Sequence, residues 1–309
     1  MTRHLSTSGS VPRPADLRQI IERIRRVPDG SRTFTEPELS LARLYRVPPT
    51  LLTQLLDAGM PHRGSGQGRR FDRYDLANVG LWLGLPCAQR QVMRWWSRAM
   101  TAAVPGRDAH FTLGIVGVCP SPGHDGGCRF ALDPRFEAAT AASPPTELSP
   151  GSYTVEVALP CEQRYFEPPF TALLEPAARL WFHYLPTDLD RDIGFAADTG
   201  LANCHLATRY LVHLASGMGL PVRRASGYFL TPPYGTEHVW PEFEVDGRWW
   251  PADPFMLTSL ARWGVLDPRQ WPPNRSPQGF FWRLGAGHVK VLRHRDTLVH
   301  PQPTVSLHQ

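Results

Sequence analysis

The sequence contains a single lysine, Lys290, although lysine and arginine together number 33. The basic residues are therefore almost all arginines, a bias that we attribute to genome composition rather than to function. The formal net charge of +5 permits a nucleic-acid or an acidic partner without requiring one. Charge alone thus excludes little.

Long apolar runs are missing as well. No stretch of about 18 apolar residues is present, so we predict no membrane span and no membrane partner. The first residues, "MTRHLSTSGSVPRPADL", have a basic start but lack the apolar segment of a secretory signal. The cysteines are odd in number, which without an export signal predicts reduced thiols and a cytoplasmic protein: Cys87, Cys119, Cys128, Cys161 and Cys204.

Common cofactor motifs are also lacking. There is no Walker motif, no dinucleotide fingerprint and no HExxH, so we expect no cofactor. The segment "CPSPGHDGGC" contains Cys119, His124 and Cys128, which with Cys161 offer the ligands of a structural zinc site. Their spacing fits no common zinc motif and no CxxC is present. We therefore expect disordered or buried thiols and no metal.

The composition is that of a globular protein. The chain has 309 residues, of which 42% are hydrophobic, and this is enough to form a sizeable hydrophobic core. The pattern changes along the chain. We expect a flexible tail over residues 1–14, a helical domain over 15–102, a strand-rich lead-in over 103–170 and the main domain over 171–309. "ADLRQIIERIRRV" opens the helical part, with apolar residues three and four apart.

The helical part is expected to hold helices over Pro37–Tyr45 and Pro49–Ala58, a glycine-rich turn and a helix from "DRYDLANVGLWLGL". "LARLYRVPPTLLTQLLDAGMPHR" and "RRFDRYDL" resemble the winged helix-turn-helix of MerR-type and excisionase-like proteins. If this segment, residues 37–75, binds DNA, the helix from Pro49 would enter the major groove and contacts to phosphates would come from Arg63, Arg69 and Arg70. That helix has hardly any base-reading side chain, so a bundle that binds a protein or supports the main domain is favoured.

The main domain is expected to begin with a helix from Thr171 through "ALLEPAARLWFHYL". A second helix, from Asn203 to Ser216, carries Cys204 near its start, where unpaired N–H groups favour a thiolate. "LPVRRASGYFL" reads as a strand, followed by a loop, "TPPYGTE". The adjacent His205 is a poor partner for Cys204, because neighbouring helical residues point about 100° apart.

"HVWPEFEVDGRWWPADP" then predicts a hairpin that turns at Asp246–Gly247. His238 begins one strand and Asp253 ends the next, so the hairpin can bring them within hydrogen-bonding reach. These positions provide the three roles that thiol acyl transfer requires. Cys204 is the nucleophile, His238 is the base, and Asp253 orients His238. The alternative for Cys204 is a plain core thiol.

These residues resemble the transglutaminase-like superfamily, with its papain-like Cys–His–Asp core. The resemblance rests on Cys204 with "ATRYLVHLASGMGLPVRRASGY", on "HVWPEFEVDGRWWPADP" and on "GAGHVKVLRHRDTLV", and covers roughly Thr171 to Val299. It implies an α+β fold in which the cysteine-bearing helix packs on an antiparallel sheet, preceded by a small helical domain. The family glycine beside the cysteine is replaced by Asn203, which we expect to cap the helix.

The resemblance implies acyl transfer through a thioester on Cys204, from a peptide, protein or carrier-linked donor to an amine or water. Amide synthesis or transamidation is favoured, and a peptidase or amidase of the same fold is the alternative. A chain with one lysine is a poor amine donor for crosslinking to itself. A third possibility is a DNA- or protein-binding regulator with a sensing or inactive domain. Substrate contacts are expected from Tyr228, Trp240 and Glu242.

Overall fold

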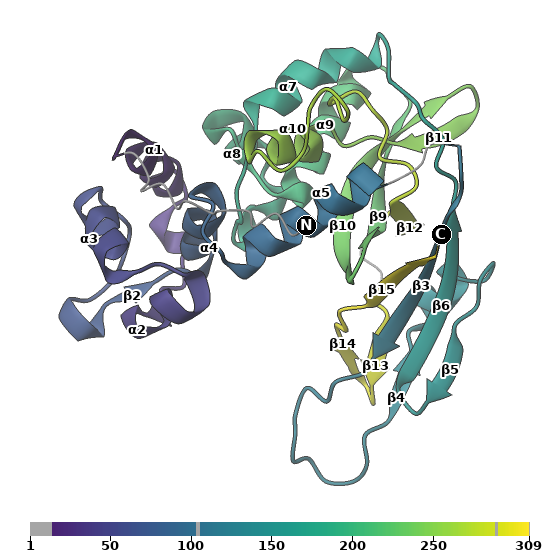
Figure 1. Cartoon of the computed structure of the whole chain (residues 1–309), viewed down its shortest axis with the longest axis horizontal. Coiled ribbons are helices and arrows are strands. Elements are labelled where there is room, and N and C mark those ends of the chain that lie inside the picture. The colour runs from purple at the N-terminus through teal and green to yellow at the C-terminus, as the bar shows by residue number, and fades with distance from the viewer. Residues whose placement is uncertain (1–13, 103–105, 288–289, 309) are drawn as a thin grey trace, which may run out of the picture. The chain divides into compact units, whose positions relative to one another are not determined.

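The computed structural model describes residues 14–102, 106–287 and 290–308 (Figure 1). The described residues form two compact units. The first comprises the residues up to Val92 together with His183–Leu189, and the second comprises Met93–Phe182 together with the chain from Asp190 onward. The tail expected over residues 1–14 lies outside the described residues except for Pro14, which opens the first helix.

The first unit is mainly helical. Its elements are α1 (Pro14–Arg25), α2 (Glu38–Ser40), a π-helical turn (Leu41–Tyr45), α3 (Pro49–Asp57), α4 (Arg73–Trp82), the start of α5 (Ala88–Ala102), and the short paired strands β1 (Glu36–Pro37) and β2 (Arg70–Phe71). The apolar stripe of α1 is buried against side chains of α3, α4 and β2, among them Leu55, Phe71 and Leu76. The expected helices are therefore confirmed, with the stretch from Pro37 to Tyr45 divided between α2 and the π-helical turn.

Two residues set the boundaries of helices in this unit. Pro49 occupies the first turn of α3, where its missing N–H costs no hydrogen bond. Asp72 caps α4, because its carboxylate accepts the backbone N–H groups of Tyr74 and Asp75 at 2.8 and 3.2 Å. Among the described residues, no helix combines the length and the apolar composition that crossing a bilayer requires.

The expected helix from Thr171 to Leu185 is wrong in its second half. Helix α7 (Leu174–Arg179) ends where Leu180 adopts an extended backbone, and the chain enters β7 (Trp181–Phe182), parallel to β8 (Leu201–Ala202). The next residues, His183–Leu189, belong to the first unit. There the side chain of Asn78 accepts the N–H of Tyr184 at 2.8 Å and donates to its carbonyl oxygen at 3.0 Å. Strand pairing and this amide clamp override the helical pattern.

The second unit is built on an eight-stranded sheet in which every neighbouring pair is antiparallel. The strand order is β12-β9-β10-β15-β3-β6-β5, and β11 pairs with β10. The strands are β3 (Ala109–Val116), β5 (Thr146–Ser149), β6 (Ser152–Leu159), β9 (Val222–Thr231), β10 (Tyr234–Val245), β11 (Arg248–Pro251), β12 (Phe281–Gly285) and β15 (Thr304–His308).

Helices and a smaller sheet cover this sheet. The helices are α6 (Pro134–Ala139), α7, α8 (Ile193–Thr199), α9 (Cys204–Gly217) and α10 (Pro254–Arg262), and the smaller sheet joins β4 (Phe130–Leu132), β13 (Leu292–His294) and β14 (Thr297–Val299). Helix α9 packs on β9 and β10, and α7 and α10 pack against α9 (Figure 1). The α+β class expected from the sequence, a helix bearing the cysteine on an antiparallel sheet, is confirmed.

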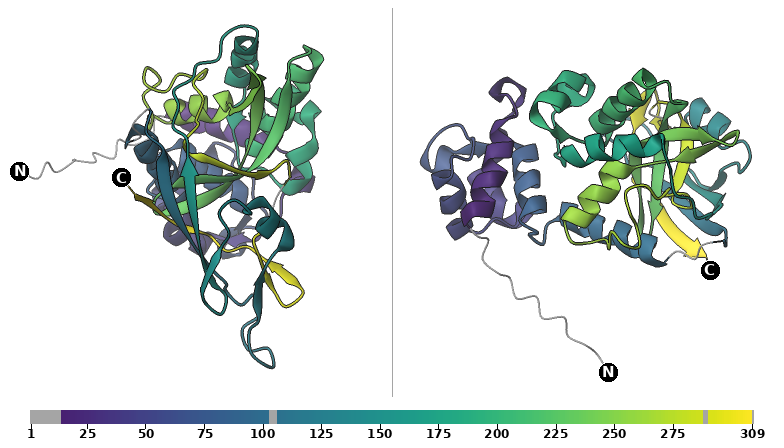
Figure 2. Two further views of the ribbon diagram at one scale, coloured as in Figure 1. Left: turned by 90° about the vertical axis from the view of Figure 1, so that its right-hand side faces the viewer. Right: turned by 90° about the horizontal axis from the view of Figure 1, so that it is seen from above.

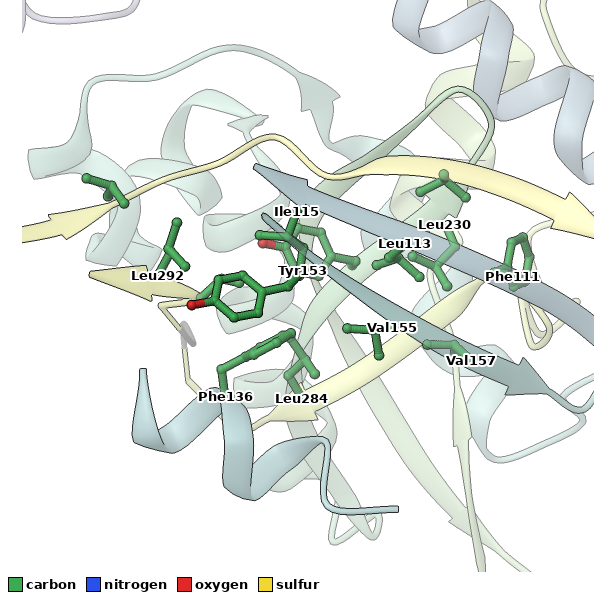
Figure 3. Close-up of a cluster of buried hydrophobic side chains, with 14 residues drawn as sticks. Phe111, Leu113, Ile115, Phe136, Tyr153, Val155, Val157, Leu230, Leu284 and Leu292 are labelled. Carbon is green, nitrogen blue, oxygen red and sulfur yellow. The ribbon is translucent and has the colours of Figure 1, made fainter. Parts of the chain in front are cut away.

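The lead-in strands contribute to a hydrophobic core that they share with other strands of the second unit. "HFTLGIVGV", "CRFAL" and "SYTVEVAL" form β3, β4 and β6, as predicted. Alternate residues of β3 and β6 point to one face, where Leu113 and Val155 meet Phe136 of α6 and Leu284 of β12 (Figure 3). Leu292 of β13 joins the same cluster, so the small sheet is anchored to the large one through this core.

Strand β10 is longer than expected. The predicted loop "TPPYGTE" shrinks to Pro232–Pro233, and pairing with β9 resumes at Tyr234. His238 therefore lies inside a strand, opposite Gly227 on β9. A Cβ on Gly227 would lie 1.9 Å from the carbonyl oxygen of Trp282 on β12, so only glycine fits there. The hairpin turn at Asp246–Gly247 is confirmed, since both residues have positive φ.

Candidate active site

Cys204 is the first residue of α9, and the residue before it caps the helix. The side-chain oxygen of Asn203 accepts the N–H of Leu206 at 3.0 Å, as expected from the sequence. Its amide nitrogen donates to Asp190 at 2.5 Å. Both bonds hold the turn, so the partly exposed thiol stands at the N-terminal end of α9, where the helix has its unpaired N–H groups.

The nearest preceding glycine, Gly200, ends helix α8 and does not shape the turn at Cys204. Gly200 ends α8 with φ of 68°, and its N–H bonds to the carbonyl of Ala196. A Cβ there would lie 3.3 Å from the carbonyl oxygen of Arg179. The buried strand β8 then leads straight into Asn203. The turn at the cysteine is thus shaped by asparagine capping and not by glycine.

His238 lies within β10 and is 4% exposed. Aromatic rings surround its imidazole: Trp240 is stacked at 6.0 Å between ring centroids, and the ring of Phe281 meets it edge-on at 5.1 Å. Trp96 and Phe229 lie slightly further away, at 6.1 and 6.2 Å. These neighbours restrict rotation of the ring and exclude water from its sides.

Asp253 uses each of its carboxylate oxygens for a separate purpose. Oδ1 accepts the N–H of Met256 at 2.8 Å and so caps α10, in which Pro254 takes the first position. Oδ2 lies 2.6 Å from Nε2 of His238. The β10–β11 hairpin carries Asp253 back to His238, and the cap then fixes the direction of its carboxylate.

The three predicted residues are brought together. Nε2 of His238 is occupied by Asp253, and the side chain of Cys204 lies close enough to the ring to help raise its pKa. The arrangement runs from thiol to imidazole to buried carboxylate, in the order that nucleophilic catalysis requires.

The electrostatics of His238 favour the imidazolium. Burial alone would lower its pKa, but hydrogen bonds to Asp253 and Cys204, with the negative charges of both groups, raise the pKa of His238 to about 9. The ring is therefore expected to be protonated at neutral pH, with its positive charge beside Cys204.

Arginines also lie near the thiol. Arg224 on β9 donates to Nδ1 of His205 at 3.4 Å and interacts electrostatically with Arg209, Cys204, Arg191 and Asp190. Burial, together with the positive charges of Arg209 and Arg191, lowers the pKa of Arg224. The Nε groups of Arg209 and Arg224 find no hydrogen-bond acceptor among the described residues. Donors and positive charge therefore stand next to Cys204.

Sequence reasoning missed Arg224, although a signal was there. Successive residues of a strand point to opposite faces. Arg223 pairs with Glu242, through Nε and Oε2 at 2.7 Å, so its neighbour Arg224 has to point the other way, toward α9. Asp190 offered no such signal, because its position depends on the return of the chain from the first unit.

The residues predicted to contact substrate are buried. Trp240 is fully buried and stacks on His238, and Tyr228 is 2% exposed and stacks on Trp282. Glu242 is 4% exposed and accepts hydrogen bonds or ion pairs from Arg223 and Arg283. These side chains support the strands and the imidazole, and their contact with a substrate stays a prediction.

The residues predicted to contact nucleic acid lie in the first unit. The guanidinium of Arg63 lies 4.8 Å from the ring centre of Phe34, and Arg69 bonds to Glu38 at 2.8 Å. Arg70 pairs with Arg63 through the backbone, and its side chain is exposed. Two of the three guanidinium groups thus already have partners within the unit, and DNA binding stays a prediction.

The cysteines considered for zinc separate into two places. Cys161 is buried beside Gly279, away from the others. Cys119, His124 and Cys128 gather instead with His294, a residue that sequence reasoning did not consider. No local spacing could have indicated it, because His294 lies on β13, far along the chain.

Comparison with known proteins gave one match. Residues 178–254 match the family model described as the transglutaminase-like superfamily. The matched segment runs from α7 to the first residue of α10, and so contains Cys204, His238 and Asp253. No curated protein and no solved structure matches the chain.

Proposed function

The transglutaminase-like core of this chain, residues 178–254, is a fold of cysteine-based acyltransferases and peptidases, and from it we propose that the protein catalyses acyl transfer through a thioester on Cys204. The superfamily is usually enzymatic. The single observation that carries the proposal is the buried imidazole of His238, which is hydrogen-bonded to Asp253 through Nε2 and lies close to Cys204.

In the proposed reaction, the thiolate of Cys204 attacks the carbonyl carbon of the acyl donor. The negative charge that develops on the carbonyl oxygen is stabilised by N–H groups at the start of α9. The imidazolium of His238 gives its proton to the leaving group, and a thioester remains on Cys204. His238, now neutral, takes a proton from the incoming amine or water, which attacks the thioester and releases the free thiolate.

We favour an amine as the acceptor, with water as the alternative. The aromatic walls of His238 keep water from the sides of the imidazole, which suits amide formation over hydrolysis. Amide formation and hydrolysis use the same three residues, so product analysis is needed to identify the acceptor. A peptidase or amidase would release the free acid even when a primary amine is in excess.

The test of the nucleophile uses iodoacetamide, briefly and at low dose, at pH 6, followed by peptide mass mapping. Cys204 is expected to react at least about tenfold faster than each of the other cysteines, because an adjacent imidazolium favours its thiolate. The variant His238→Ala is expected to lose this excess. His213→Ala, which changes an exposed histidine of α9, is the matched control and should label like the wild type.

The proposal of a thiolate–imidazolium pair fails if Cys204 is labelled no faster than the other thiols. It also fails if the labelling rate of Cys204 is the same in His238→Ala as in the wild type. Circular dichroism of each variant separates this result from loss of the fold. If His238→Ala unfolds, labelling of the wild type alone still decides whether Cys204 is activated.

We further propose that the acyl donor carries an anionic group that Arg224 binds. A hydrogen bond to a charged group contributes about 1.5–3 kcal/mol, or roughly tenfold or more in KM. Arg224→Ala is therefore expected to raise KM about tenfold for p-nitrophenyl hydrogen succinate and to leave p-nitrophenyl acetate little changed. Arg269→Ala, at an exposed site paired with Asp267, is the control. Equal losses with both esters would contradict the proposal.

A further inference from the structure

We infer that Cys119, His124, Cys128 and His294 form a structural zinc site. The two sulfurs and two imidazole nitrogens that these residues offer lie within 4.8 Å of one another. Two thiolates and two neutral imidazoles form a donor set that binds zinc in preference to magnesium or calcium. They would balance the charge of Zn²⁺ and leave the centre neutral.

The distances suit tetrahedral coordination. Zinc–sulfur bonds of about 2.3 Å and zinc–nitrogen bonds of about 2.05 Å place two nitrogens about 3.3 Å apart and a nitrogen and a sulfur about 3.5 Å apart. In the structure, Nε2 of His124 lies 3.3 Å from Nε2 of His294 and 3.6 Å from Sγ of Cys128. The sulfur atoms of Cys119 and Cys128 lie within 4.8 Å of each other. The four donors thus already surround a space of the right size.

The imidazole of His124 is oriented for binding through Nε2. Its Nδ1 lies 3.1 Å from the carbonyl oxygen of Asp125, which accepts the Nδ1 proton and leaves Nε2 with a free lone pair. Zinc-bound histidines usually have such a hydrogen bond on the other nitrogen. His294 is buried and its ring packs against Phe130 at 4.9 Å, so its orientation is fixed as well.

The topology brings the fourth ligand to the loop. Residues 117–129 connect β3 to β4 without regular structure and project beyond the end of the sheet (Figures 1 and 2). Phe130, at the start of β4, pairs with His294 in the register of β4 and β13. Cys128 therefore arrives beside His294 as the chain enters β4.

The loop needs such a centre because it has almost no apolar core. Over residues 118–128, the side chains that are not fully exposed are Cys119 and His124, and Val118 is 73% exposed. Arg295 holds the loop through the carbonyl oxygens of Asp125 and Gly127, at 2.6 and 3.3 Å. A zinc ion with four protein ligands has no open position, so we assign it a structural role, tying the loop to β13.

The full-length protein is dialysed first against zinc and then against zinc-free buffer. The bound zinc is then released and measured with the chromophore 4-(2-pyridylazo)resorcinol. The wild type is expected to release one zinc per chain. Cys128→Ser and His294→Gln are each expected to release almost none. Cys161→Ala, which changes a buried cysteine outside the cluster, is the control and should release as much as the wild type.

Cobalt substitution keeps the test independent of how the variants fold. Wild-type protein loaded with Co²⁺ is expected to show the strong visible bands and the sulfur charge-transfer absorption of a tetrahedral site with two thiolates. The inference is overturned if the wild type retains neither metal, if zinc survives Cys128→Ser, or if the purified protein has a Cys119–Cys128 disulfide in place of zinc.

Discussion

Replacing Cys204 with alanine is expected to lower the rate of acyl transfer by about 10⁴-fold or more, the scale of loss seen when a catalytic nucleophile is removed. Without the sulfur no thioester can form, and what remains is binding and oxyanion stabilisation. The side chain is partly exposed, so the change leaves no large cavity and the fold should be kept. The effect is therefore on chemistry and not on stability.

The measurement uses p-nitrophenyl acetate as a general acyl donor. The wild type is expected to show a burst of one p-nitrophenolate per chain and an acetyl adduct that maps to Cys204. Cys204→Ala should show neither, while Cys161→Ala should behave as the wild type does. A burst that persists in Cys204→Ala, with the adduct on another cysteine, would assign the nucleophile elsewhere.

Replacing Asp253 with asparagine is expected to move the alkaline limb of the pH profile of kcat/KM downward. Asparagine can still accept the proton of Nε2, but it lacks the negative charge that helps to raise the pKa of His238 to about 9. Loss of an opposite charge at this distance lowers such a pKa by ~1–3 units. The limb, which is expected near pH 9 in the wild type because the proposed mechanism requires a protonated His238, should fall accordingly.

The same charge affects stability with a defined sign. The pKa of His238 is raised above the ordinary value of 6.5 to about 9, so the folded state binds a proton more tightly than the unfolded state does. This stabilisation is complete below pH 6.5 and is lost as the pH rises to about 9. Urea unfolding between these pH values is expected to show the decline in the wild type and a smaller one in Asp253→Asn.

Asp253→Ala is expected to destabilise the fold much more, by roughly 3–5 kcal/mol, since it leaves a buried imidazolium without its partner and α10 without its cap. Asp192→Ala provides the matched control. Asp192 caps α8 by accepting the N–H of Phe195 at 3.0 Å but is exposed, so its loss should cost only about 1 kcal/mol. Equal losses of unfolding free energy in the two variants would mean that the hydrogen bond between Asp253 and His238 does not stabilise the fold.

Much of this arrangement could be predicted from local sequence. Asp246–Gly247 specifies a tight hairpin turn, and Asp253–Pro254 specifies a helix start, so the approach of His238 and Asp253 follows from short-range rules. Asn203 likewise marks the start of α9. Each of these signals depends on residues within one turn or one hairpin.

What could not be predicted depends on long-range packing. The helical pattern through Leu180 gave no sign that β7 would pair with β8, because parallel pairing is set by distant residues. His294 approaches the cysteines of the loop only through the register of β13 with β4. The early start of β10 at Tyr234 likewise follows from its pairing with β9, which outweighs the turn-forming residues of "TPPYGTE".

The interleaving of the two units restricts where the chain can be cut. Because His183–Leu189 belongs to the first unit, a fragment that begins after Val92 would keep this segment while losing the amide of Asn78 that clamps it. Leu185 and Leu189, now buried, would be left exposed to water. The amino-terminal unit is therefore not a detachable module, and deletion mapping that treats it as one would report misfolding as loss of function.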